Sequence, residues 1–127
     1  MMVIPKGELK MEILDQVKLI VKTLDLKKAE DITVLKIDDL TVISDYFVIA
    51  SATNSTQLKA LANEVEFELE KVDVRPVHTE GYDGGIWVLL DYGSIIVHIF
   101  MQDSRMFYSL ERLWSDAQEI DISDMLN

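Results

Sequence analysis

The sequence predicts a single α/β domain, a mixed β-sheet of about five strands with helices packed on it. Three observations lead to this class. The 127 residues fit one domain and are 49% hydrophobic and 28% charged, as in ordinary globular chains. Segments with helical periodicity are interspersed with short β-branched segments. Finally, a single glycine separates two of the β segments, which predicts an antiparallel hairpin within the sheet.

The first half of the domain is expected to hold two helices and two strands, after a frayed lead-in at residues 1–7. Apolar residues recur at steps of three and four in the helical segments. Asn54 and Gln57 are spaced like a capping box, which marks the start of the second helix. The predicted order is a helix over 8–26, strands over 32–37 and 45–51, and a helix over 54–72. The strand over 45–51 is apolar on both faces and is therefore expected to be central.

The second half is expected to hold three strands and a last helix. Pro76 indicates an edge strand or the start of a strand, because proline cannot donate to a neighbouring strand. Gly93 links two strands so closely that they must form a hairpin. The predicted order is strands over 74–81, 86–92 and 94–100, a helix over 104–117, and an acidic tail over 118–127 that is loosely held. The domain itself is thus expected to cover residues 8–117.

Charge and cysteine content narrow the function classes. The net charge is −11, from 23 acidic and 12 basic residues, which works against broad binding of nucleic acid. The acidity either serves solubility alone or steers the protein to a basic partner. Without cysteine there is no disulfide framework and no thiolate chemistry. No signal peptide and no apolar run long enough for a membrane span is found, so we expect a cytoplasmic protein with no membrane association.

Most catalytic motifs are missing, but one enzymatic hypothesis stays open. The sequence has no phosphate-binding GxxxxGK[ST] loop, no GxGxxG after a strand and no GxSxG turn. Asp45 and Asp91 lie at strand ends and could bind magnesium for nucleotidyl transfer. The loop at 51–56, however, has no glycine to cradle a phosphate. His78 and His98 do not have metal-ligand spacing, and we expect His98 to be satisfied by a local hydrogen bond.

An aromatic surface is the alternative to catalysis. Alternation along the strand over 86–92 places Trp87, Leu89 and Asp91 on one face, and Val88, Leu90 and Tyr92 on the other. One face must pack on helices. If the other face is open, an aromatic and aliphatic cluster with an acidic rim would be typical of a binding hot spot. If a second helix covers that face, the same residues are core.

Taken together, these segments resemble the ribosomal silencing factor family, also called the Iojap family. The resemblance runs from about Leu9 to Ser115, and its motifs are specific in their order and spacing rather than singly. They are Asp45–Ile49, Asn54–Gln57, Glu80–Gly81, Trp87–Gly93, Val97–Phe100 and Arg105–Trp114. The chain departs from the family pattern at Ser94, where an aspartate is usual.

The resemblance implies a nucleotidyltransferase-like fold without catalysis and without a cofactor. Such proteins dock on ribosomal protein L14 of the large subunit and sterically block joining of the small subunit, which represses translation when nutrients are scarce. The contacts expected on this basis are Trp87, Leu89, Asp91, Tyr92, Tyr46 and Arg105. A homodimer that uses the apolar sheet face as its interface is also possible. The runner-up function is a small magnesium-dependent nucleotidyltransferase or nucleotide-binding protein.

Overall fold

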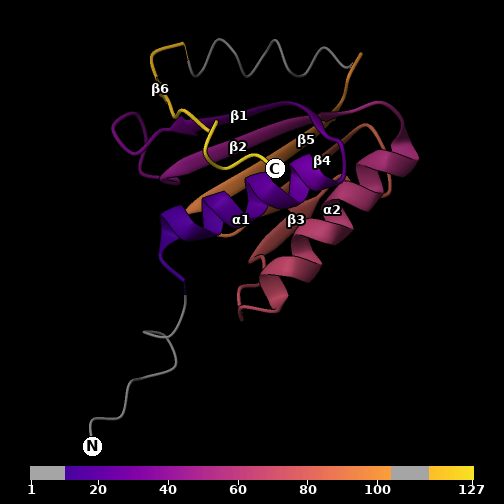
Figure 1. The fold of residues 1–127 in the computed structure, drawn as a ribbon, viewed down its shortest axis with the longest axis horizontal. Coiled ribbons are helices and arrows are strands. Elements are labelled where there is room, and N and C mark those ends of the chain that lie inside the picture. Colours follow the sequence, from indigo (N-terminus) through magenta and orange to yellow (C-terminus); the bar gives the residue numbers. More distant parts are fainter. Residues whose placement is uncertain (1–10, 104–114) are drawn as a thin grey trace, which may run out of the picture.

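The computed structural model describes residues 11–103 and 115–127 (Figure 1). Its elements are α1 (Ile13–Leu26), β1 (Glu30–Lys36), β2 (Tyr46–Ala52), α2 (Ser55–Glu70), β3 (His78–Glu80), β4 (Trp87–Asp91), β5 (Ile95–Met101) and β6 (Gln118–Glu119). The predicted α/β domain with a mixed sheet is confirmed. None of the described helices has the length and apolar character needed to cross a membrane.

The described strands form one six-stranded sheet in the order β3-β4-β5-β2-β1-β6. Only β2 and β5 pair in parallel, and every other neighbouring pair is antiparallel. As predicted, β2 is central and β4 and β5 form a hairpin. Of the two positions that Pro76 left open, the structure shows the edge, where β3 begins at His78. The expected count of about five strands is one too low, because β6 was not predicted.

Two helix boundaries differ from the prediction. Met11 and Glu12 are not helical, and α1 begins at Ile13 with no side-chain hydrogen bond to its first amides. The sequence there offers no serine, threonine or aspartate to act as a cap, so periodicity alone did not fix the boundary. The helix predicted over 104–117 lies mostly outside the described residues. Its predicted end is wrong, because Ser115 and Asp116 form a turn.

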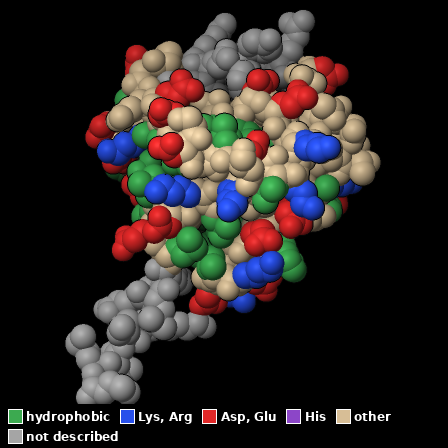
Figure 2. Space-filling view, viewed as in Figure 1, with side chains coloured by type: hydrophobic (Ala, Val, Ile, Leu, Met, Phe, Trp, Pro, Cys, Tyr) green, Lys and Arg blue, Asp and Glu red, His purple; other side chains and the backbone are tan. Residues whose placement is uncertain are grey.

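Both described helices pack on the same face of the sheet, which forms the main hydrophobic core (Figure 1). From α1 it takes Val17, Ile20, Val21 and Leu24, and from α2 Leu58, Leu61, Ala62, Val65 and Leu69. The sheet contributes alternate residues, among them Val48, Val88, Leu90 and Val97. The outer surface of this helix layer mixes acidic, basic and apolar side chains (Figure 2). It therefore presents no field of a single sign that would attract one class of partner.

The predicted cap of α2 is confirmed and also joins the two helices. The side-chain oxygen of Asn54 accepts from the backbone N–H of Gln57 at 2.8 Å. The Gln57 side-chain oxygen reaches back to the N–H of Thr53, one residue before the cap, at 2.7 Å. Its amide nitrogen donates to the carbonyls of Lys27 and Lys28 just after α1, at 3.3 and 3.1 Å. This single side chain thus ties the start of α2 to the end of α1.

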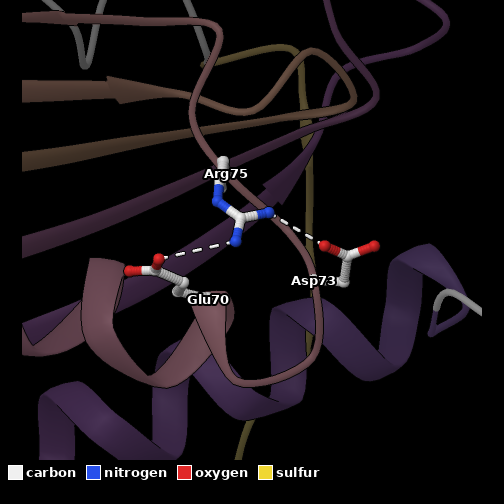
Figure 3. Close-up of polar contacts among 3 residues, drawn as sticks. All are labelled: Glu70, Asp73 and Arg75. Carbon is white, nitrogen blue, oxygen red and sulfur yellow. Dashed lines mark hydrogen bonds and ion pairs between the residues drawn. The ribbon is translucent and has the colours of Figure 1, made fainter.

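An ion-pair cluster follows the other end of α2 (Figure 3). Asp73 adopts a left-handed conformation with φ 63°, which turns the chain away from the helix. Arg75 then donates to Asp73 at 2.8 Å and meets Glu70 at 3.5 Å. The hydrogen bond to Asp73, followed by the charge of Glu70, raises the pKa of Arg75 above its ordinary value. The cluster therefore braces the turn that leads from α2 towards β3.

The expectation that residues 118–127 are loosely held is wrong. Gln118 and Glu119 form β6, which pairs with Lys36 and Leu35 of β1. Three half-buried apolar side chains then pack on the main core: Ile120, Ile122 and Met125. Asn127 donates from its backbone and side chain to the Asp25 carboxylate at 2.8 and 3.1 Å, and these two bonds lower the pKa of Asp25. Acidic composition suggested a solvated tail, but every second or third residue in this segment is apolar and has a place in the core.

Candidate partner-binding surface

The β4–β5 hairpin presents Trp87, Leu89 and Asp91 on the sheet face opposite α1 and α2. Alternation predicted this grouping, and Val88 and Leu90 lie in the main core as expected. All three side chains are half-buried. Gly81 fixes the start of β4, because its φ is +83° and a Cβ there would collide with the Trp87 carbonyl oxygen. The backbone of Gly81 thus approaches the backbone carbonyl of Trp87 more closely than a residue with a side chain would allow.

Strand register arranges this second face in rows that run across the sheet. One row continues from Asp91 through Ile96 and Phe47 to Leu35. The next row continues from Leu89 through His98 to Ile49. Trp87 is paired with Phe100, which is fully buried. An apolar strip therefore crosses four strands, with Asp91 and the exposed β3 residues His78 and Glu80 at one border.

Trp87 is held in place by an aromatic stack. Its ring lies nearly parallel to those of His98 and Phe100, with centroids 6.0 and 6.2 Å away and interplanar angles of 9° and 11°. Its indole N–H donates to Nδ1 of His98 at 3.3 Å. Phe47 meets the His98 ring edge-on at 4.9 Å. A tryptophan fixed by two rings and a hydrogen bond loses little conformational freedom when a partner covers it.

His98 is neutral and nearly enclosed. Burial lowers its pKa from 6.5 to about 4, so the imidazole carries no proton on Nδ1 and can accept from Trp87. Nε2 must then carry the hydrogen, and within the described residues this buried group has no hydrogen-bond partner. The sequence predicted a local hydrogen bond for His98. The bond instead crosses strands to Trp87, which the spacing of eleven residues did not reveal.

Tyr46 and Tyr92 face the opposite side of the sheet from Trp87, Leu89 and Asp91. Both pack on the main core beside the helices. The Tyr92 hydroxyl is buried with no partner among the described residues. Burial, and to a smaller extent the nearby charge of Glu66, raises the pKa of Tyr92. The six predicted contact residues therefore do not form one cluster in the described structure, and Arg105 lies outside the described residues.

Within the described residues, no further metal ligands gather around Asp45 and Asp91, the two carboxylates of the enzymatic hypothesis. Asp91 caps its own turn, because its carboxylate accepts from the N–H of Gly93 at 2.8 Å. Asp45 precedes β2, which β5 separates from β4. His78 bonds to Glu80 at 2.9 Å on the surface. Among residues 11–103 and 115–127, no three His, Asp or Glu side chains gather closely enough to hold a metal ion.

The loop at residues 37–45 (the β1–β2 loop) carries surface features that sequence reasoning missed. The sequence places residues 38–45 between two predicted strands as a connection, and the structure exposes Leu40, Val42 and Ile43 at its tip. The loop and the β4–β5 turn together line a hollow of about 390 Å³. The available signal was a short apolar run that belongs to no predicted helix or strand. It is flanked by Asp38, Asp39 and Asp45.

Known proteins match this chain over most of its length. The family model described as "Ribosomal silencing factor during starvation" matches residues 10–127. A ribosomal silencing factor of Bacillus subtilis is 36% identical over 103 residues, which cover 81% of this chain and 87% of that protein. The mouse mitochondrial assembly of ribosomal large subunit protein 1 is 30% identical over 102 residues, 78% of this chain and 45% of that protein. A crystal structure of a Chromobacterium violaceum protein superposes with a TM-score of 0.79 at 34% identity, covering 89% of this chain and 93% of that one.

Proposed function

The chain belongs to the ribosomal silencing factor family, and on this premise we propose that it silences ribosomes by steric block. In this proposal it binds ribosomal protein L14 on the large subunit, in the cytoplasm, and prevents the small subunit from joining. Translation would fall as a result when nutrients are limiting. The protein acts by occupying a surface, without turning over a substrate.

The observation that carries the docking part of the proposal is the ordered aromatic anchor on the second face. Trp87 is half-buried and stacked on His98 and Phe100, and it shares its face with Leu89 and, at the other end of β4, Asp91. Aromatic anchors of this kind dominate binding energy when a partner completes their burial. The net charge of −11 adds an attraction for a basic ribosomal protein. The aromatic anchor favours docking through this face, while the net charge favours a basic partner without selecting a face.

The absence of catalysis is part of the proposal and rests on the family and on the carboxylates. Relatives are named for silencing ribosomes. Within the described residues, Asp91 is occupied as a turn cap and Asp45 has no set of further metal ligands around it. A magnesium-dependent nucleotidyltransferase would need at least two carboxylates directed at one ion.

Sedimentation with isolated ribosomal subunits tests the proposal. Wild-type protein should pellet with large subunits and not with small subunits, and it should lower the formation of joined ribosomes. Trp87→Ala should weaken binding by about 2 kcal/mol, or roughly 30-fold, because it removes the central anchor. Leu26→Ser is the matched control, since Leu26 is 61% exposed at the end of α1 on the helix side.

Two results would overturn the proposal. Wild-type protein that stays in the supernatant with large subunits would remove the docking function. Equal binding by a folded Trp87→Ala variant would remove the assignment of the anchor.

Light scattering across a concentration series, done in parallel, tests whether a second copy of the chain covers the same face as a homodimer.

A further inference from the structure

The β1–β2 loop exposes an unusual amount of apolar surface for its length. Val42 is 103% exposed, Ile43 is 72% exposed and Leu40 is 48% exposed. A single exposed aliphatic residue is ordinary on a protein surface. Three within four consecutive positions make a local apolar tip, and apolar surface of this kind is typical of interaction sites when polar residues surround it.

The tip is held in a defined shape by its own hydrogen bonds. The N–H groups of Leu40 and Thr41 donate to the carbonyl of Ile37 at 2.9 and 3.1 Å. The N–H of Ile43 donates to the Thr41 hydroxyl at 3.2 Å. Ile37 and Ser44 are buried at either end of the loop, with 3% and 6% exposure. Val42 and Ile43 therefore project outward from a backbone that is anchored at both ends of the loop.

The loop is fastened to the β4–β5 turn and thereby to the proposed docking surface. The N–H groups of Asp45 and Tyr46 both donate to the carbonyl of Ser94, at 2.9 and 3.0 Å. The same turn is capped by Asp91, one of the residues on the Trp87 face. In Figure 1 the loop projects from the end of the sheet away from the start of α2. The loop that carries the apolar tip thus lies beside the turn that Asp91 caps.

Charge around the tip has one dominant sign. Asp38 and Asp39 precede the apolar residues and Asp45 follows them. Lys36 is the cation placed beside the loop, and Asp38 approaches its ammonium group at 3.9 Å. The hollow between the loop and the turn is lined by both Asp38 and Asp45. An apolar tip inside an acidic rim is complementary to an apolar patch surrounded by lysine or arginine.

We propose that the β1–β2 loop is a second contact for the same basic ribosomal protein, with Val42 and Ile43 as its apolar anchors and the three aspartates as its rim. This inference rests on the proposed function and extends its binding surface beyond the Trp87 face. The loop contact reaches the partner from the end of the sheet, while Trp87 reaches it from the second face. Two contacts at an angle would fix the orientation of the bound protein, which a steric block requires.

The test compares loop and control variants in binding to isolated large subunits. The double variant V42S/I43S should bind at least about tenfold more weakly than wild type, because two apolar side chains no longer lose their water on docking. Its urea midpoint should match that of wild type, since both residues are already solvated in the free protein. Leu26→Ser, at an aliphatic position that is 61% exposed on the helix side, should bind like wild type.

Rim charge is tested with D38N/D39N. Rim charges act mainly on encounter, so this variant should associate several-fold more slowly, with little change in the dissociation rate. The difference from wild type should shrink as salt is raised. If D38N/D39N associates as fast as wild type at every salt concentration, the two carboxylates face only water in the complex. This result would remove the aspartates from the proposal.

The outcomes separate the loop proposal from the function it rests on. If wild type binds and folded V42S/I43S binds equally well, the loop is not a contact although the silencing function stands. If wild type does not bind large subunits, both proposals fall. If the double variant unfolds, the single variant Val42→Ser takes its place, because a side chain at 103% exposure contributes no packing in the free protein.

Discussion

The two faces of the sheet differ in the size of their buried clusters and in the polar side chains that they carry. The face under α1 and α2 buries apolar side chains from its strands, among them Val48, Leu90 and Val97, and next to them the hydroxyl of Tyr92. The second face combines buried Ile49 and Phe100 with a histidine, a half-buried tryptophan and an aspartate. Polar atoms are costly in a core and are tolerated where they bond or serve a surface. If the proposed docking is correct, the first face serves stability alone, while the second face combines a smaller buried cluster with the partner contact.

Leu61→Ala tests the first half of this contrast and has the largest expected effect. Leu61 is 1% exposed within the main core, on the side of α2 that faces the sheet. Its truncation leaves a cavity and should lower the free energy of unfolding by roughly 2–5 kcal/mol. Urea unfolding followed by circular dichroism measures the loss.

The same variant also shows whether stability and recognition are separable. At a temperature where Leu61→Ala is still folded, it should bind large subunits like wild type. Weakened binding by the folded variant would mean that the helix layer takes part in docking, and the division between the faces would fail.

His98→Gln tests the second face through pH and has the next largest effect. The folded-state pKa of His98 lies at about 4, below its ordinary value of 6.5, so the unfolded chain binds the proton more readily. Its contribution to stability is therefore intact above pH 6.5 and is lost as the pH falls towards 4. This difference amounts to about 2 kcal/mol at about pH 5 relative to about pH 8.

Glutamine has no titrating group, so the variant should lack that part of the pH dependence while other groups keep theirs. Unfolding free energies of both proteins at several pH values between about 8 and 5 provide the measurement. Parallel curves for wild type and variant would show that His98 titrates as freely in the folded protein as in the unfolded chain. Trp87 fluorescence in the same samples reports whether its stack is kept.

Periodicity predicted the faces of the sheet well because each residue of a strand has only two directions to point. The alternation along β4 separated Trp87 from Val88, and Gly93 announced the hairpin. The same alternation placed Tyr92 opposite Trp87, and the structure agrees. Grouping Tyr92 with Trp87 as one contact surface came from the family resemblance, which carries no information about which way a side chain points.

Features that depend on contacts between distant segments were not predictable. Strand β6 has two residues and no period, and it exists because β1 offers an open edge. The segment around Val42 connects two strands as expected, but the sequence did not reveal that its anchored ends leave its apolar side chains outside the core. The bond from Trp87 to His98 depends on strand register, which a single sequence does not specify.

Deletion of residues 118–127 has the smallest expected effect on stability and discriminates most sharply between the roles of the two faces. The segment adds Ile120, Ile122 and Met125 to the core on the helix side, but each is only half-buried and ordering the segment costs entropy. The net loss in unfolding free energy should therefore be only about 1–2 kcal/mol. Binding to large subunits should be unchanged, because none of these three side chains belongs to the Trp87 cluster.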